Sequence, residues 1–222
     1  DDIDNAKENM SKILDILSQK TSDYRVSLID YRDYSSRTGT SYDYPYKVQL
    51  SFTNDNEQIK NSIYSLDLGD GGDTEETVYS ALIEASKLDW RGDAKKVIII
   101  LGDAAPLDPE PETGYTYQDV AAALYASDIS LDYEESDKRV TDFMNNGLIN
   151  VYSIGTNASD KASDFFREIS EDTGGNFLSI DDASEVSDAI IDSIEQIDIT
   201  NLVPVSIDFG QSFAIKEIDI YK

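Results

Sequence analysis

The amino-acid sequence predicts an α/β protein, a doubly wound and mostly parallel sheet with helices on both faces, followed by a short β tail. Strand-like apolar runs alternate along the chain with stretches whose apolar residues recur every three or four positions. One run, VIIIL at Val97–Leu101, is apolar on both sides, as a parallel strand between two helical layers must be. A chain of 222 residues is long enough to bury a substantial core.

The first half of the chain is expected to hold three helices and three strands. The helices are predicted at residues 3–17, 56–66 and 78–88, and the strands at 24–34, 47–52 and 97–101. In the second strand Val48, Leu50 and Phe52 alternate with polar residues, which indicates a half-buried edge strand. The polar segment 35–45 is expected to be a loop.

The second half continues the alternation of helices and strands. Residues 103–117 contain three of the five prolines and should be irregular. Further helices are predicted at 118–126, 135–146, 162–169 and 183–197, and strands at 150–154 and 177–180. Gly174 and Gly175 are expected to end the third of these helices.

The end of the chain differs in kind. Apolar and polar residues alternate through VPVSIDFG (203–210) and FAIKEIDIY (213–221), a pattern typical of antiparallel strands. We therefore expect two parts, an α/β domain at 1–198 and a β tail, or the start of a neighbouring β domain, at 199–222.

Composition excludes several functions. Forty-five acidic and 18 basic residues give a net charge of −27, which would repel nucleic acid and anionic lipid. The chain has no cysteine and no histidine, so thiol nucleophiles, the usual zinc sites and imidazole-based triads are excluded. The longest apolar run is too short to span a bilayer. A lack of disulfides suits both a cytoplasmic and a bacterial surface protein.

The stretch GDGGDTEETVYSAL (69–82) combines glycines, acids and a threonine just before a helix. It fails as a calcium-binding EF-hand loop, because glycines stand where oxygen ligands are needed. It also lacks the Gly-Lys-Ser/Thr ending of a phosphate loop. Two interpretations remain: Asp73 or Thr74 caps the helix, or Thr74 presents its hydroxyl to a site built from several loops.

VIIILGDAAP (97–106) favours the second interpretation. Asp103 directly follows a buried parallel strand, and ligands of open α/β sheets bind at the carboxyl ends of the strands. The Thr74 hydroxyl and the Asp103 carboxylate are oxygen donors of the kind that Mg²⁺ prefers.

At this point the sequence resembles the von Willebrand factor type A family, most closely its bacterial and alpha-kinase-type members. The resemblance covers roughly residues 1–198, and it is the order and spacing of the segments that carry it. These segments are DDIDNAKENMSKILDIL, VSLIDYRDY, GGDTEETVYSALIEA, VIIILGDAAP, and INVYSIGT with FREISEDTGGNFLSIDD.

The resemblance implies a metal-ion-dependent adhesion site, in which Mg²⁺ or another divalent cation is held by three loops. Its threonine corresponds to Thr74 and its aspartate to Asp103. The third loop, Asp-x-Ser/Thr-x-Ser, lies in the family between the first strand and the first helix, whereas this sequence begins at that helix with Asp1. We expect an upstream segment or a separate chain to supply the missing strand and loop, and weak Mg²⁺ binding without them.

Four further residues are candidates for partner contact. Asp108 and Glu110 lie in the proline-rich loop, and Tyr115 and Tyr117 stand beside them. Loops at this end of the fold carry specificity, and tyrosine is enriched at interface hot spots. The alternative is a solvated loop whose tyrosines pack against the loop itself.

Two other features have structural explanations. Arg91–Asp93 spells RGD, which some integrin-type receptors read, but a turn between a helix and a strand is the simpler interpretation. Asp30 and Asp33 end a strand near the expected site, where pairing with Arg32 or capping of a loop explains them better than metal ligation.

The function expected from the sequence is a non-enzymatic protein-binding or adhesion module that takes an acidic group of a partner, an extracellular matrix, host or cell-surface protein, through Mg²⁺. It would be extracellular or at the cell surface, with a cytoplasmic location as the alternative. Two other functions stay open: an enzyme with paired carboxylates, such as a glycoside hydrolase, and an intracellular assembly subunit.

Overall fold

The computed structural model describes residues 2–66, 75–91, 94–125 and 148–199. Its helices are α1 (Asp2–Lys20), α2 (Ser35–Thr38), α3 (Asn56–Tyr64), α4 (Val78–Ser86), α5 (Tyr117–Tyr125), α7 (Asp160–Asp172) and α8 (Val186–Gln196), with a 3₁₀ turn η1 (Ala183–Glu185) before α8. Its strands are β1 (Val26–Tyr31), β2 (Tyr46–Thr53), β3 (Glu75–Glu76), β4 (Lys96–Gly102), β5 (Ala105–Pro106), β6 (Ile149–Thr156) and β7 (Phe177–Ile180).

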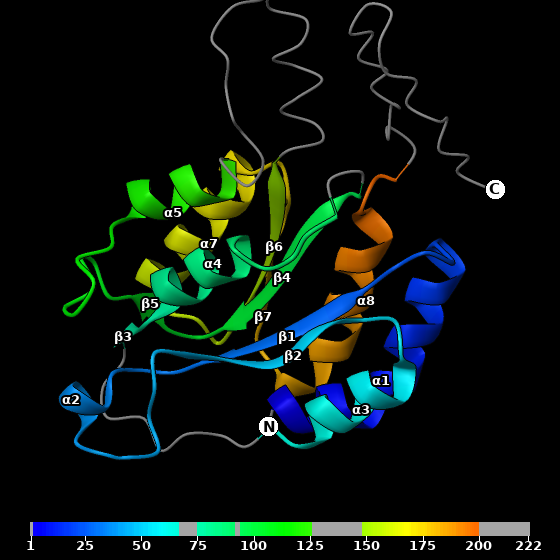
Figure 1. Ribbon diagram of the computed structural model, residues 1–222, viewed down its shortest axis with the longest axis horizontal. Coiled ribbons are helices and arrows are strands. Elements are labelled where there is room, and N and C mark those ends of the chain that lie inside the picture. The colour runs from blue at the N-terminus through cyan, green and yellow to red at the C-terminus, as the bar shows by residue number, and fades with distance from the viewer. Residues whose placement is uncertain (1, 67–74, 92–93, 126–147, 200–222) are drawn as a thin grey trace, which may run out of the picture.

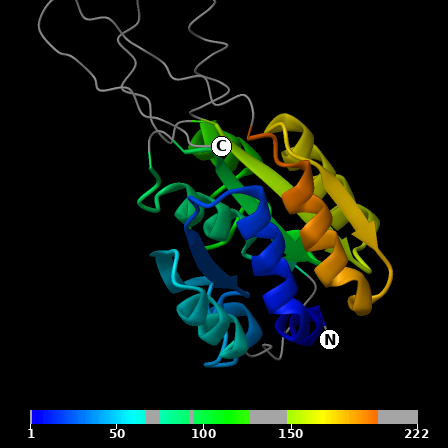
Figure 2. The same cartoon turned by 90° about the vertical axis from the view of Figure 1, so that its right-hand side faces the viewer.

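The strands form a central layer with helices on both sides, which confirms the predicted fold class. Helices α4, α5 and α7 cover one face, and α1, α3 and α8 cover the other (Figure 1). Figure 2 shows α1 and α8 side by side on the second face. Two adjacent residues of β4 demonstrate the double cover, because Ile98 packs against the cluster of the first face and Ile99 against that of the second.

The strands pair in three separate groups. The largest is parallel, in the order β4-β6-β7, with Val97 opposite Asn150. Strand β1 pairs antiparallel with β2, which supports the prediction of an edge strand at β2. The two-residue strands β3 and β5 form a parallel pair. Within the described residues β1 and β4 have no backbone pairing with each other.

Burial is uneven across this layer. Every residue of β6 is buried, whereas every residue of β1 and most of β4 are only half-buried. The apolar clusters on the two faces nevertheless include side chains of β1 as well as of β4. In β1, Tyr31 packs against the cluster of one face and Val26 against that of the other. Strands β1 and β4 thus lie between the same two helical layers, and within the described part of the chain they do not pair with each other.

Helix α7 ends at the predicted glycines. Gly174 has φ 70° and its N–H bonds the Glu171 carbonyl at 3.2 Å, while the N–H of Gly175 bonds the Ser170 carbonyl at 2.9 Å. This pair of bonds is a Schellman motif, in which glycine takes the left-handed position. The turn leads the chain directly into β7.

Three local predictions need correction. Segment 35–45 contains the short helix α2, the proline-rich segment contains the short strand β5, and the last predicted helix begins with the 3₁₀ turn η1. The predicted helix at 135–146 and the tail strands from 203 onward lie outside the described residues.

Candidate functional site

The residues that follow the two predicted ligands, Thr74 and Asp103, pair at one edge of the strand layer. Thr74 itself lies outside the described residues. The next residue, Glu75, is the parallel partner of Ala105, two residues beyond Asp103. Asp103 follows the end of β4, its side chain is exposed, and it has no ion-pair partner among the residues that the structure describes. The pairing of β3 with β5 therefore places the residue after Thr74 beside the segment that follows Asp103.

Tyr31, the last residue of β1, lies at this edge beside the end of β4. Its hydroxyl donates a hydrogen bond of 2.8 Å to the Leu101 carbonyl. Burial raises the pKa of Tyr31 above its ordinary value, and the negative charges of Glu76, Asp103 and Asp30 raise it further. Three carboxylates, from β1, β3 and the loop after β4, thus act on one hydroxyl.

This oxygen-rich, negative edge fits a hard divalent cation in donor type and charge. The described part of the chain contains no group of three acidic side chains placed to hold a metal ion by itself. Asp103 is the described residue that would hold the ion, and further ligands have to come from segments such as the one that contains Thr74.

Asp30 and Asp33 have the structural roles expected of them. Asp30 pairs with Arg32 at 3.4 Å. One carboxylate oxygen of Asp33 accepts from the Tyr34 N–H at 2.6 Å, and the other pairs with Arg37 at 3.3 Å. Both acids fix the loop after β1.

Glu110 is an internal acceptor of its loop. Its side chain is 1% exposed, and its carboxylate accepts from the Ser80 N–H at 2.8 Å, the Tyr34 hydroxyl at 2.9 Å and the Thr113 hydroxyl at 3.1 Å. The Ser80 hydroxyl also bonds it. Because both carboxylate oxygens accept hydrogen bonds from within the protein, Glu110 points inward and is not part of the surface that could contact a partner.

Asp108 and Tyr117, the other predicted contact residues of the loop and of the start of α5, come together in one pocket. The pocket measures about 280 Å³, and its lining includes Pro106 of β5, three residues after Asp103. Its lining comes from α4, β5, the following loop, α5 and α7: Tyr79, Pro106, Asp108, Tyr117, Gln118, Lys161, Asp164, Phe165 and Glu168. The α7 residues could not be recognised from the sequence, because their pattern is that of an ordinary exposed helix face. The one indication is the four-residue spacing of Asp164 and Glu168, which places both on the same face of the helix.

The remaining candidates lie apart from this pocket. Tyr115 is half-buried, and its carbonyl accepts from the Glu110 N–H at 2.9 Å, so it helps to close the loop. Arg91 of the RGD triplet pairs with Asp23 at 2.7 Å, and the other two residues of the triplet lie outside the described residues.

None of the described helices is both long and apolar enough to cross a membrane.

Comparison with known proteins places the fold. No family model matches the sequence, and no curated protein matches it. Among solved structures, the chain is similar to a von Willebrand factor type A protein from Catenulispora acidiphila, with a TM-score of 0.53 and 16% identity over 86% of this chain. The match spans 37% of the Catenulispora chain.

Two Bacteroides structures are also similar. BatB, a conserved hypothetical protein from Bacteroides thetaiotaomicron, matches with a TM-score of 0.51 and 16% identity over 87% of this chain and 86% of its own. An aerotolerance-related membrane protein from Bacteroides fragilis matches with a TM-score of 0.47 and 16% identity over 88% and 89%.

The chain therefore has a von Willebrand factor type A-like fold, in agreement with the segments that suggested it. Within that class, the described residues show a form in which β1 and β4 are not paired with each other and the segment after Asp103 pairs with β3.

Proposed function

We propose that this protein is a non-enzymatic binding module that takes an acidic group of a protein partner through a divalent cation held at the edge of the sheet. Asp103 and Thr74 supply two of the protein ligands. When bound, the cation offers an open position to a carboxylate of the partner. The proposal includes an extracellular or cell-surface location, which a chain without cysteine permits.

The pairing of β3 with β5 is the observation that carries this proposal. Two loops separated by about thirty residues in sequence are held side by side, since Glu75 and Ala105 are strand partners. Hydrogen bonds reinforce the entry to α4, where Thr77 donates its N–H to the Arg32 carbonyl at 2.9 Å. The edge that results carries Asp103, which is exposed and has no ion-pair partner among the described residues.

The proposal also requires an additional strand between β1 and β4. Among the described residues the two strands do not pair with each other, and unpaired edges within a layer covered by helices are costly. Half-buried apolar residues such as Val97 and Ile29 would become fully buried by such a strand. A strand in that position is covered on both faces, so it must be apolar on both sides.

The direction of α1 indicates how this strand connects. Lys12 of α1 pairs with Asp188 near the start of α8 at 2.8 Å, and Lys20 bonds the carbonyl of Glu195 near its end. The two helices therefore run in the same direction, and α8 begins shortly after β7 ends. Helix α1 thus starts at the carboxyl edge of the sheet. A strand parallel to β4 would end at this same edge, so the loop that connects it to α1, the proposed metal loop, would lie there too.

The tail is a poor candidate for this strand. Its segment 203–209, VPVSIDF, contains a proline and places serine and aspartate at alternate positions. Proline cannot donate to a strand ladder, and the polar side chains would be buried against a helical layer. The polypeptide before α1 is the source we propose.

The test is a titration with Mg²⁺ followed by backbone NMR. We expect saturable shifts concentrated at residues 75–77 and 102–107, which are absent in Asp103→Ala and Thr74→Ala. Asp89→Asn, an acid at the opposite edge, is the matched control and should respond like the wild type. Shifts spread over the acidic surface, unchanged in both site variants, would contradict the proposal.

A further inference from the structure

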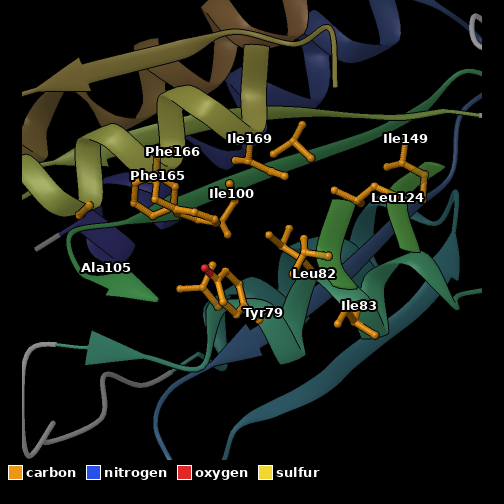
Figure 3. Close-up of a cluster of buried hydrophobic side chains, with 14 residues drawn as sticks. Tyr79, Leu82, Ile83, Ile100, Ala105, Leu124, Ile149, Phe165, Phe166 and Ile169 are labelled. Carbon is orange, nitrogen blue, oxygen red and sulfur yellow. The ribbon is translucent and has the colours of Figure 1, made fainter. Parts of the chain in front are cut away.

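The pocket beside Asp103 has the chemistry of a site for a cationic side chain. It is a formed hollow, and buried aromatic rings make up its floor. Tyr79 is 2% and Phe165 7% exposed, and their ring centroids lie 5.7 Å apart in an edge-to-face arrangement. Figure 3 shows both rings at the Ala105 end of the buried cluster. Both rings belong to the lining of the pocket, and aromatic rings attract cations.

The third ring of the pocket is fixed in place. Tyr117 lies 6.3 Å from Phe165, at nearly a right angle to it. Its hydroxyl donates a 2.6 Å hydrogen bond to Asp172 at the end of α7. The ring of Tyr79 is held by burial, since its side chain is 2% exposed. Because both rings are fixed in place, they lose little freedom when a ligand enters.

The rim of the pocket carries excess negative charge. Asp108, Asp164 and Glu168 have no cationic partner among the residues that the structure describes. Lys161 is the one basic lining residue, and it pairs with Glu75 on β3. Three carboxylates around one already paired ammonium group leave the pocket negative.

We propose that this pocket binds an arginine side chain of the protein partner. A guanidinium group stacks on aromatic rings and takes carboxylates at its planar edge, a combination that suits the floor and rim better than a lysine ammonium would. The volume of about 280 Å³ lies at the lower limit of ligand pockets, roughly 300 Å³, which fits one long side chain and not a larger molecule.

This inference rests on the proposed function, since it names a second group of the same partner. The pocket lies next to the loop that carries Asp103, because Pro106, three residues beyond Asp103, is part of its lining. A partner would then present a carboxylate to the cation and an arginine to the pocket. Two separate contacts of opposite charge also fix the orientation of the partner.

The experiment uses two small probes with the 222-residue protein at low ionic strength in EDTA. N-acetyl-arginine amide carries the guanidinium, and N-acetyl-citrulline amide has nearly the same shape without its charge. We expect the arginine probe alone to shift backbone NMR signals of the pocket residues, with Tyr117 and Phe165 among them. Equal shifts from both probes, or arginine shifts spread over the whole surface, would overturn the proposal.

Variants separate the pocket from the general negative charge of the chain. Asp164→Asn with Glu168→Gln should weaken arginine binding about fivefold or more, the effect of losing exposed charge pairs. Asp192→Asn with Glu195→Gln removes the same charge from the exposed face of α8 and should leave the affinity unchanged. An equal loss in both double variants would refute a specific site.

The two proposals fail in different ways. The arginine measurement is made in EDTA, so its outcome does not depend on any cation. If Asp103→Ala abolishes the Mg²⁺ response while the citrulline and arginine probes behave alike, the cation site stands and the pocket proposal falls. The reverse result would leave an arginine pocket on a protein without the proposed cation site.

Discussion

The hydroxyl of Tyr31 donates to the carbonyl of Leu101 at 2.8 Å, and this bond joins two sheets that share no backbone pairing in the described structure. The tyrosine ring crosses from the end of β1 to the end of β4 and also packs near Gly102 and Phe166. It closes the carboxyl end of the unpaired region, next to Asp103.

Removing this hydroxyl should weaken the link between the sheets. Tyr31→Phe keeps the ring and loses one hydrogen bond, so we expect the free energy of unfolding to fall by about 1 kcal/mol. Urea denaturation measures it. Tyr42→Phe, on a side chain that is 72% exposed, is the control and should change nothing. Equal stability of Tyr31→Phe and wild type would show that the bond does not hold the sheets.

The buried carboxylate of Glu110 should be a major support of the proline-rich loop. Glu110→Gln replaces one acceptor oxygen by an NH₂ donor. One of the groups that donate to Glu110, from Ser80, Tyr34 or Thr113, then loses its acceptor. We expect a loss of about 1–3 kcal/mol in unfolding free energy, measured by thermal denaturation. Glu171→Gln, on the exposed side of α7, makes the same chemical change and should be neutral; a neutral Glu110→Gln would argue against the network.

The turn after α7 should tolerate no side chain at Gly175. A Cβ there would lie 1.9 Å from the carbonyl oxygen of Val151 on β6. Because backbone cannot move aside as a flexible side chain can, Gly175→Ala should cost about 3 kcal/mol or more. Gly114→Ala is the matched control: it has φ +73° and no atom within 4 Å of its Cβ, so it should cost only about 1 kcal/mol. Similar losses in both would contradict this account.

Alkaline pH should destabilise the protein through its buried phenols. Burial raises the pKa of Tyr79, with Asp108 adding to the shift, and burial together with Asp172 raises the pKa of Tyr117. Because the pKa of these phenols is raised in the folded state, the free energy of unfolding keeps its full value below pH 10.0, the ordinary pKa of tyrosine. It falls as the pH rises above that value. Denaturation curves across this range test the effect.

The variants provide the check on that assignment. Tyr79→Phe and Tyr117→Phe cannot ionise at these positions, so the fall in stability with rising pH should be shallower in each. An unchanged pH dependence in both variants would mean that other groups control alkaline unfolding.

The helices and the long strands could be predicted from local pattern. Periodic apolar residues located α1, α4 and α7, and the continuous run at 97–101 correctly indicated a strand covered on both faces. The short elements could not be found in this way. Segment 35–38, SSRT, has no apolar residue to set a period, and β3 and β5 exist as strands only because distant residues pair.

The same limit applies to the candidate site. Asp103 could be proposed from the sequence because it follows a buried strand, which is a local feature, and its role as a metal ligand stays a prediction. That Glu110 turns inward, while Asp108 faces a pocket, depends on the path of the loop against α4. Asp164 and Glu168 look like any acidic pair on an exposed helix face, and only the packing of α7 beside β5 and α5 makes them part of a pocket.

The central claim is that the cation site is shared between the described edge and a strand and loop supplied before α1. Calorimetric titration of Mg²⁺ tests it on two proteins: the 222-residue chain, and the same chain extended upstream by an apolar strand that ends in Asp-x-Ser-x-Ser. The account predicts weak binding by the first and tight binding by the second, lost again in Asp103→Ala. Equal, tight binding by both chains would contradict it.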